Sequence, residues 1–405
     1  MMVPRLRLSL FKDDKSSRWS LAHLGEIVEF KKGKGISKSD ISNNGTYPCV
    51  RYGELYTIYN EKIDKIQSKT NCNPNEHVVS KSGDILIPAS GETAVDIARA
   101  SAILRSDVIL GGDINILSPK SNSLNSLFLS YSIVGKKKME LAKMAQGNSV
   151  VHLYPNQLKT LEIWIPLIDE QTKIADFLST IDEKIKLLTQ QHYLLGQYRK
   201  GLIQNILSKE LRFKDENGKE FPEWNLVRLG NYLIRYNEKS TENNQYPVLT
   251  SSREGIYFQK DYFNGEDIAS KNNIGYNVVP KGYFTYRHMS DDLVFKFNIN
   301  TLCDKGIVST LYPVFTTKLN ALFLQLKLNE GNEFRDHAIQ QKQGGSRTYM
   351  YYSKLESLKL MIPNTAEQTK IANFISAFDD KIAAKKTELD KLKTWKQGLL
   401  QQMFV

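Results

Sequence analysis

The chain has 405 residues, 41% hydrophobic and 24% charged, a composition typical of globular protein and unlike that of a disordered or fibrous chain. This length exceeds the usual size of one hydrophobic core, so we expect two or three domains. The formal net charge of +11 favours a polyanionic partner such as nucleic acid, with an anionic membrane or a charge that only aids solubility as the alternatives.

The region before residue 167 reads as short strands separated by turns. Strand-like runs cover residues 47–52 and 83–88, and residues 127–145 are expected to be helical. Lysines stand beside glycines at residues 30–35, where we expect a loop. This mixture predicts a mixed α/β unit, although the strand order does not follow from it.

A long helix follows, expected over residues 167–208. Pro166 precedes it, and Glu170 places negative charge in its first turn, where the helix dipole favours a carboxylate. Apolar residues then recur at an average spacing of 3.5 residues, which is typical of helices that pack along a seam. At about 1.5 Å per residue, a helix of about 38 residues is roughly 57 Å long.

A second region of the same character covers residues 209–363. A strand-like run occupies residues 278–286, a helical stretch is expected over 319–341, and basic residues stand beside polar and aromatic ones at 251–253, 286–288 and 344–349. Lysine suits phosphate, whereas arginine, asparagine and serine can also read base edges. A solvated surface loop is the alternative for each residue. The candidate DNA contacts are Lys31, Lys32, Lys34, Arg51, Ser90, Asn148, Ser149, Ser252, Arg253, Arg287, Ser346, Arg347 and Thr348.

The second half of the chain repeats the first. Residues 170–177 read EQTKIADF and residues 367–374 read EQTKIANF, an offset of 367 − 170 = 197 that continues through both helices. The segment from Trp19 to Gly25 resembles that from Trp224 to Gly230, and residues 6–8 resemble residues 211–213. The duplication therefore looks almost circular, and we expect the two chain ends to lie near each other.

The heptad pattern predicts which side chains meet along the helix–helix seam. Eight of ten seam positions are apolar in each helix, the exceptions being His192 and Arg199 in the first helix and Lys385 and Lys396 in the second. If the helices pair antiparallel, the two globular regions are related by a pseudo-two-fold axis; the alternative is that each helix packs only on its own globular region. The predicted apolar seam residues are Ile174, Leu178, Ile181, Ile185, Leu188, Leu195, Leu202, Ile371, Ile375, Phe378, Ile382, Leu389, Leu392 and Leu399.

Several kinds of site find no pattern in the sequence. Three widely spaced cysteines predict free thiols, and six scattered histidines show no spacing of metal ligands. Phosphate-binding GxxxxGK[ST], hydrolase GxSxG and zinc motifs are missing, as is the Asn-Pro-Pro-aromatic motif of methyltransferases that modify amino groups. The missing catalytic motifs predict a non-catalytic protein. No apolar run approaches the roughly 18 residues of a membrane span, and residues 1–7 do not read as a signal peptide, so we expect a cytoplasmic protein.

The duplicated EQTKIADF and EQTKIANF segments, each introduced by Ile-Pro and continuing to a Gly-Leu pair, resemble the conserved regions of the specificity subunit of type I restriction-modification systems. The openings at Trp19 and Trp224 resemble the edges of that family's target-recognition domains. The resemblance implies an α+β fold with two mixed α/β target-recognition domains separated by two long antiparallel coiled-coil helices. The expected boundaries are 1–166 and 209–363 for the recognition domains, and 167–208 and 364–405 for the helices.

The resemblance also implies a function. Each recognition domain would read one half of a bipartite, asymmetric sequence in double-stranded DNA, while the helices set the spacer and dock two methyltransferase subunits; restriction subunits would then join. No cofactor is expected on this chain, and S-adenosylmethionine, ATP and Mg are expected on the partner subunits. Two alternatives stay open: a two-headed scaffold for RNA or nonspecific DNA, and a nuclease or methyltransferase with an unrecognised motif.

Overall fold

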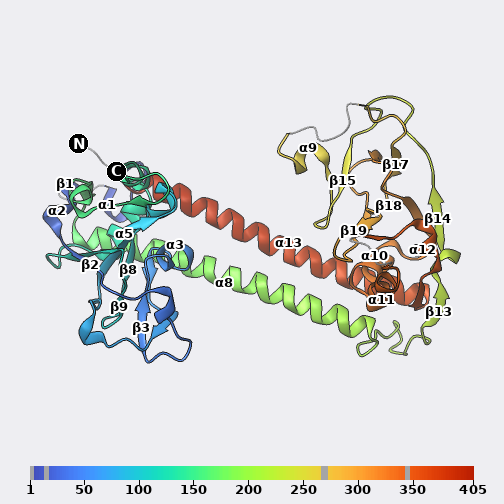
Figure 1. Cartoon of the computed structure of the whole chain (residues 1–405), viewed down its shortest axis with the longest axis horizontal. Coiled ribbons are helices and arrows are strands. Elements are labelled where there is room, and N and C mark those ends of the chain that lie inside the picture. Colours follow the sequence, from blue (N-terminus) through green and yellow to red (C-terminus); the bar gives the residue numbers. More distant parts are fainter. Residues whose placement is uncertain (1–3, 13–17, 266–271, 343–346) are drawn as a thin grey trace. The chain divides into compact units, whose positions relative to one another are not determined.

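The computed structural model describes residues 4–12, 18–265, 272–342 and 347–405, and its chain divides into two compact units (Figure 1). Unit 1 comprises Met1–Gln190 and Lys386–Val405, and unit 2 comprises Gln191–Lys385. Two long helices contribute to both, because α8 (Ile168–Leu207) begins in unit 1 and ends in unit 2, whereas α13 (Thr365–Gln402) does the reverse. Among the described residues, no helix contains an apolar stretch of the length that a membrane span requires.

Unit 1 is built on a five-stranded sheet in the order β2-β10-β6-β8-β4. All five residues of its central strand β6 are buried, as expected for a strand covered on both faces. A second sheet has three strands in the order β5-β3-β9, and these strands are interspersed along the chain with those of the five-stranded sheet. The elements are α1 (Ser9–Lys12), β1 (Ser20–His23), α2 (Leu24–Ile27), β2 (Val28–Lys32), η1 (Lys38–Asp40), β3 (Tyr47–Val50), α3 (Glu54–Thr57), β4 (Lys62–Ile63), β5 (Ser68–Thr70), η2 (Pro74–Glu76), β6 (Asp84–Pro88), β7 (Ser90–Gly91), α4 (Ala94–Ile97), β8 (Ser101–Ile103), β9 (Ile109–Leu110), β10 (Ile114–Pro119), α5 (Ser126–Val134), α6 (Lys138–Met144), β11 (Val151–His152), α7 (Pro155–Leu158) and β12 (Glu162–Ile165).

Unit 2 has a four-stranded antiparallel sheet in the order β14-β22-β18-β20 and several two-stranded ladders. Phenylalanines dominate its core, where the rings of Phe284 and Phe315 stack with their centroids 4.8 Å apart. The elements are β13 (Asn225–Arg228), η3 (Leu229–Asn231), β14 (Leu233–Tyr236), β15 (Leu249–Ser251), β16 (Ile256–Phe258), α9 (Gln259–Tyr262), β17 (Asn277–Pro280), β18 (Phe284–Thr285), β19 (Met289–Ser290), β20 (Asn298–Ile299), β21 (Lys305–Val308), β22 (Val314–Thr317), α10 (Ala321–Glu330), α11 (Asn332–Gln340), β23 (Thr348–Tyr349), α12 (Tyr352–Ser357) and β24 (Lys359–Ile362).

Each unit closes in the same way, by pairing its first strand with the strand before the long helix. In unit 1, β1 pairs antiparallel with β12, and in unit 2, β13 pairs antiparallel with β24. A tryptophan precedes the first strand of each pair and packs edge-on against a phenylalanine of a core helix. The ring centroids are 5.8 Å apart for Trp19 and Phe128 of α5, and 6.0 Å apart for Trp224 and Phe323 of α10. The repeat seen in the sequence is therefore also a repeat of packing.

The Glu-Gln pair of the repeated motif lies buried at the start of each long helix. In unit 2, Gln368 donates to the Pro363 carbonyl at 2.9 Å and accepts from the backbone N–H of Asn320, which caps α10. In unit 1, Gln171 makes the corresponding bonds to the Pro166 carbonyl and the Asn125 N–H. Each glutamine therefore ties its long helix to the core helix of its unit.

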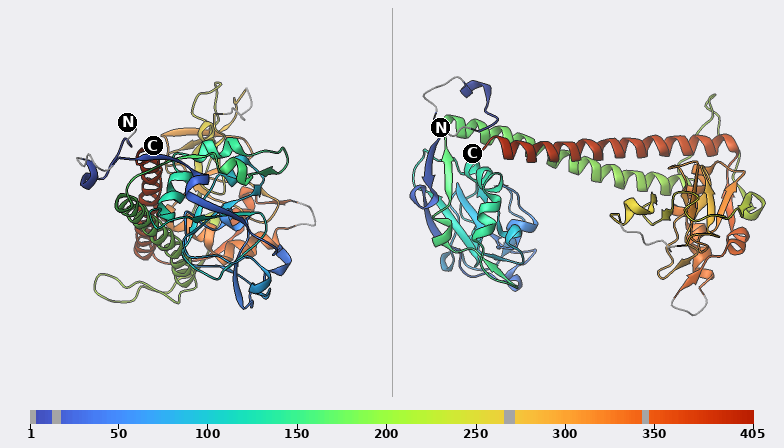
Figure 2. Two further views of the ribbon diagram at one scale, coloured as in Figure 1. Left: turned by 90° about the vertical axis from the view of Figure 1, so that its left-hand side faces the viewer. Right: turned by 90° about the horizontal axis from the view of Figure 1, so that it is seen from above.

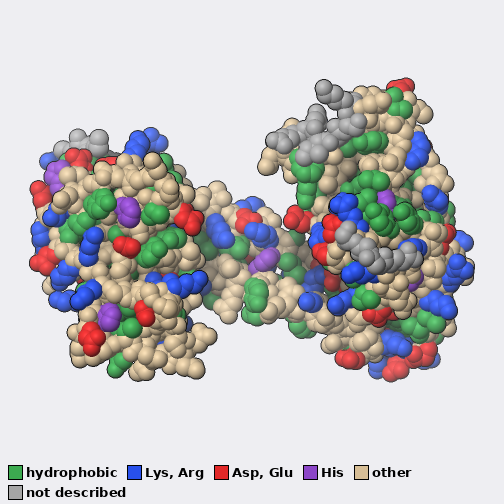
Figure 3. All heavy atoms as spheres, in the orientation of Figure 1, with side chains coloured by type: hydrophobic (Ala, Val, Ile, Leu, Met, Phe, Trp, Pro, Cys, Tyr) green, Lys and Arg blue, Asp and Glu red, His purple; other side chains and the backbone are tan. Residues whose placement is uncertain are grey.

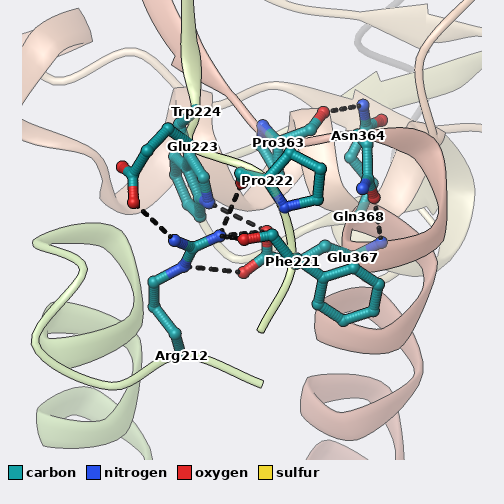
Figure 4. A network of polar contacts seen from close by, with 9 residues as sticks. All are labelled: Arg212, Phe221, Pro222, Glu223, Trp224, Pro363, Asn364, Glu367 and Gln368. Carbon is teal, nitrogen blue, oxygen red and sulfur yellow. Dashed lines mark hydrogen bonds and ion pairs between the residues drawn. The ribbon is translucent and has the colours of Figure 1, made fainter. Parts of the chain in front are cut away.

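The glutamate of each pair binds an arginine from a distant segment. Arg212 donates to both carboxylate oxygens of Glu367, at 3.3 and 3.0 Å, and the indole N–H of Trp224 donates to the same carboxylate at 3.1 Å (Figure 4). In unit 1, Arg7 donates to both oxygens of Glu170 at 2.7 Å. This equivalence gives a structural reason for the resemblance between residues 6–8 and 211–213.

The chain ends meet in unit 1, as the circular pattern predicts. The N–H of Leu6 donates to the carbonyl of Gln402 at 2.9 Å, so the first described segment lies against the end of α13. The parts of α8 and α13 that belong to this unit lie side by side (Figure 2), with Phe177 against Trp395 at 6.1 Å.

Two charged interruptions in the heptad pattern, Arg199 and Lys396, form ion pairs between the two long helices. In unit 1, Lys396 of α13 contacts Asp182 of α8 at 2.6 Å and Glu61 of the globular part at 2.8 Å. In unit 2, Arg199 of α8 pairs with Asp379 of α13, and 396 − 199 and 379 − 182 both equal 197. The two pairs are thus the same cross-link with the helices exchanged, and a polar group within an apolar seam favours one register.

Two helices expected as single stretches are broken by glycine. Residues 127–145 form α5 and α6, which are separated near Gly135, and residues 319–341 form α10 and α11, which are separated at Gly331. A Cβ atom at Gly331 would lie 2.4 Å from the Lys327 carbonyl oxygen, and one at Gly135 would lie 2.8 Å from the Leu400 carbonyl oxygen. Gly135 is therefore packed against the distant α13, whereas Gly331 lies close to the last turn of its own helix α10.

Replacing Glu367 with Ala should lower the unfolding free energy of the chain by about 3 kcal/mol, because it leaves Arg212 and the Trp224 indole without their shared buried acceptor. Urea unfolding followed by circular dichroism would measure the change. Glu223 pairs with the same arginine but is largely exposed, so Glu223→Ala is the matched control and should change stability by less than about 1 kcal/mol. Equal losses in the two variants would contradict this account.

Candidate nucleic-acid interface

The lysine candidates of unit 1 lie at the end of β2 and in the turn that follows it. Lys31, Lys32 and Lys34 are exposed. The turn approaches the backbone closely, since a Cβ atom at Gly33 would lie 2.0 Å from the Gly111 carbonyl oxygen. The Lys34 N–H donates to the Leu110 carbonyl at 3.1 Å. Close backbone packing thus holds three cations on one short segment.

Arg51 reaches the same part of unit 1 from β3. The N–H of Gly111 donates to the carbonyl of Val50, the residue before Arg51, so both segments flank residues 110–111. Arg51 is half-buried, and its guanidinium lies 3.9 Å from the buried Glu54 carboxylate. The structure therefore brings this arginine near the lysine turn while partly balancing its charge.

The other unit 1 candidates belong to the β7–β11 ladder. Asn148 and Ser149 are exposed in the loop before β11, whereas Ser90 is 4% exposed within β7, paired with His152. The ring of His152 stacks with that of Tyr154 at 6.0 Å. The loop residues are thus accessible to a partner, but the Ser90 side chain is not.

In unit 2, three candidates line one surface pocket. Ser252, Arg253 and Arg287 share it with Lys296 and Asp291. Arg253 donates to both carboxylate oxygens of Asp292, at 2.8 and 2.7 Å. That interaction, with a further hydrogen bond from Ser290, lowers the pKa of Asp292 to about 2. The carboxylate is therefore ionised at neutral pH and balances the charge of the arginine.

The remaining unit 2 candidates lie on or beside the β19–β23 ladder. The Arg347 Nε–H donates to Asp291 at 2.8 Å, and Thr348, 3% exposed, pairs with Ser290. Ser346 lies outside the described residues. Arg347 thus joins the edge of the pocket, whereas the Thr348 side chain is buried within the unit.

Asp291, Asp292 and a group of stacked aromatic rings beside them belong to the site without forming a recognisable sequence motif. Tyr349 and Tyr351 stack at 5.7 Å, and the ring of His288 lies 5.3 Å from that of Tyr351. Because 351 − 154 and 349 − 152 both equal 197, the His152 and Tyr154 stack is the equivalent in unit 1. The 197-residue repeat is therefore the sequence signal that relates the two aromatic pairs.

Charges of both signs are mixed on the surface. On the face drawn in Figure 3, Lys and Arg side chains interleave with Asp and Glu on each unit instead of forming a continuous basic field. On this face, the positive side chains are therefore scattered among negative ones.

None of the predicted seam residues is exposed. The buried members are Ile174, Leu178, Ile181, Leu188, Leu202, Ile371, Ile375, Leu389 and Leu399, and the half-buried members are Ile185, Leu195, Phe378, Ile382 and Leu392. The first turns of each long helix also belong to the core of a unit. Ile174 and Leu178 of α8 lie in one core cluster with Trp19 in unit 1, and Ile371 of α13 lies in one with Trp224 in unit 2. The helices therefore serve both as core elements and as each other's partners.

A family model described as type I restriction modification DNA specificity domain matches residues 16–195 and 224–394. The specificity subunit of type I restriction enzyme MjaVIII from Methanocaldococcus jannaschii is 24% identical, over 94% of this chain and 91% of its own length. The specificity subunit of EcoR124I/EcoR124II from Escherichia coli is 25% identical over 41% of this chain and 42% of its own length. The two family matches fall on the two repeats found in the sequence.

Solved structures show the same fold. The crystal structure of the S subunit of a type I restriction-modification system from M. genitalium has a TM-score of 0.59 and 15% identity, covering 100% of this chain and 99% of that one. A chain from a study of complex assembly and conformational transition in a type I system has a TM-score of 0.54 and 16% identity, covering 95% and 96%.

Replacing Arg253 or Arg347 with Ala should change the unfolding free energy by less than about 1 kcal/mol, because both ion pairs are at least half exposed. Arg212→Ala is the internal comparison and should cost several times more, since it strips the buried Glu367 of its cation. Urea unfolding of the three variants makes the measurement. A large loss for either surface arginine would mean that it supports the fold.

Proposed function

We propose, because the chain belongs to the type I restriction modification DNA specificity family, that unit 1 and unit 2 each read one half of a bipartite, asymmetric DNA sequence. The chain is a DNA-recognition subunit that works in a complex and is itself non-catalytic. One observation carries the proposal: the frame of the two units is repeated, whereas the polar groups presented between the shared elements differ.

The difference between the units is chemical as well as positional. Unit 1 presents three lysines at the end of β2 and in the turn after it, with Arg51 half-buried nearby, and lysine is a compact cation suited to phosphate. Unit 2 presents Arg253, Arg287 and Arg347, and arginine can also donate two hydrogen bonds to guanine. Two unlike sets of donors on one frame support two unlike half-sites.

The long helices are proposed to set the unread spacer between the half-sites. A helix rises about 1.5 Å per residue, so helix length converts directly into distance along DNA. The repeated ion pairs of Lys396 and Arg199 support this role, because they favour a single register between α8 and α13.

The same helices are proposed to dock two copies of a methyltransferase subunit. Tyr198 is 61% exposed and Trp395 is 50% exposed, and the two are equivalent because 395 − 198 = 197. Large exposed aromatic side chains are typical anchors of protein interfaces. Two equivalent anchors support two copies of one partner, with restriction subunits joining the complex.

Chemistry is assigned to those partners. They would bind S-adenosylmethionine, ATP and Mg, methylate adenine and cleave DNA in the cytoplasm, while this chain supplies the address. A methyltransferase must flip its target base out of the helix, so the address subunit has to hold the DNA in register with the catalytic site. The nonspecific scaffold and the nuclease considered above are not favoured.

Methylome sequencing of cells that express this chain with its methyltransferase subunit tests the proposal. We expect one asymmetric bipartite motif with two different half-sites and a fixed spacer. The same methyltransferase paired with another specificity subunit is the control for activity. Sequence-independent methylation, or none while that control is active, would contradict the proposal.

Inserting four residues after Thr189, with four more after the equivalent Lys386, should lengthen the helices by about 6 Å. The spacer of the methylated motif should lengthen while both half-sites stay the same. A four-residue insertion in the exposed turn at Gly218 lengthens the chain without extending a helix and should leave the spacer unchanged. A changed half-site in the helix variant would refute the assignment of spacing to the helices.

A further inference from the structure

Two surface arginines of unit 2 are each held by an aspartate of one short loop. Arg253, just after β15, donates through Nη1 and Nη2 to both oxygens of Asp292. Arg347, just before β23, donates through Nε to Asp291 at 2.8 Å. The two aspartates are consecutive and directly follow Ser290 of β19, so one loop supplies the acceptors for both arginines.

These pairs contribute little to the stability of the fold. The side chains of Arg253 and Asp292 are 60% and 51% exposed, and those of Arg347 and Asp291 are 51% and 64% exposed. Ion pairs in water gain little, because solvent screens the charges. Their main effect is therefore on what the two arginines can bind.

Each arginine keeps donors for a further acceptor. Arginine has five N–H donors; the contact of Arg347 with Asp291 uses its Nε–H, and the contact of Arg253 with Asp292 uses one N–H of each Nη group. Asp292 is itself held by the Ser290 hydroxyl at 2.9 Å and the Val294 N–H at 3.3 Å, so it fixes the orientation of Arg253. The carboxylates also cancel the long-range attraction of the cations for phosphate.

We propose that Asp291 and Asp292 are specificity-determining residues of unit 2, which orient Arg347 and Arg253 toward base edges and suppress their binding to phosphates of any sequence. The inference rests on the proposed function, since it concerns how unit 2 reads its half-site. A base edge that accepts two hydrogen bonds, such as guanine O6 and N7, rewards a fixed guanidinium, whereas phosphate contact rewards net charge.

Unit 1 provides an internal comparison. The position equivalent to Arg347 is Val150, because 347 − 197 = 150, and the position equivalent to Asp291, the residue after the paired strand, is Glu92. Unit 1 therefore keeps an acid there without the arginine. The proposed effect belongs to one half-site only.

The test uses Asp291→Asn and Asp292→Asn in the full chain, with Asp336→Asn as the matched control, because Asp336 is exposed on α11 and its replacement changes the charge equally. Binding to a duplex of random sequence is measured over a series of KCl concentrations, and preferred sequences are selected from a random duplex pool. Each loop variant should bind the random duplex more tightly. Its plot of log K against log[KCl] should steepen by about 0.9 for one freed arginine. Base preference should weaken in one half of the selected motif.

Two outcomes would overturn the inference: a salt slope and base preference equal to those of Asp336→Asn, or weaker binding to every sequence. A double variant tests whether the effect of Asp292→Asn depends on Arg253. In an Arg253→Ser background, Asp292→Asn should no longer steepen the slope, and a slope that still steepens would also overturn the inference. If the unmodified chain selects no bipartite motif, the proposed function fails; if it selects one that the variants retain unchanged, only this inference fails.

Discussion

A buried carboxylate at the first turn of each long helix is the interaction on which both units depend. An ionised group without a partner is costly to bury, so Glu170 and Glu367 require a cation. In each unit an arginine far away in sequence supplies it, Arg7 or Arg212. In unit 2 the indole N–H of Trp224 shares the carboxylate, so one site joins the incoming segment, the opening strand and the long helix. The neighbouring glutamines extend this junction to the core helices.

This junction separates the frame of each unit from its variable parts. The closing ladders β1–β12 and β13–β24 and the buried Glu-Gln pairs are repeated, so the regions between them can differ without disturbing the helices. The main sheets do differ, with five strands in unit 1 and four in unit 2. This arrangement suits the proposed function, in which a change of loops would alter the sequence that is read while the surface proposed for partner subunits persists.

Burial decides what the same kind of ion pair does in this protein. The cations of the Arg212–Glu367 and Lys396–Asp182 pairs are largely shielded from water, and these pairs hold segments of the fold together. The Arg253–Asp292 and Arg347–Asp291 pairs lie in solvent, where they add little stability and instead orient groups that a ligand can reach. The number of charges in the sequence does not separate these two classes of ion pair. Charges of both signs are mixed on the surface drawn in Figure 3.

Much of the architecture is predictable from the sequence, because repetition and periodicity are local and linear signals. The offset of 197 residues, the two long helices, the burial of their heptad positions and the meeting of the chain ends all follow from residue spacing. Arg199 and Lys396 are two of four polar interruptions of the heptad pattern, and nothing in the sequence marks them as partners of Asp379 and Asp182.

The tertiary structure alone decided the packing of Gly135 against α13, the burial of Ser90 and Thr348, and the pairing of Arg253 and Arg347 with aspartates. These features depend on contacts between segments that are far apart along the chain. Arg347 and Asp291, for example, are 56 residues apart and meet only because β23 pairs with β19. The sequence by itself determined the repeat and its long helices, because a helical period is written in neighbouring residues, whereas the identity of a distant partner depends on how strands pair and pack.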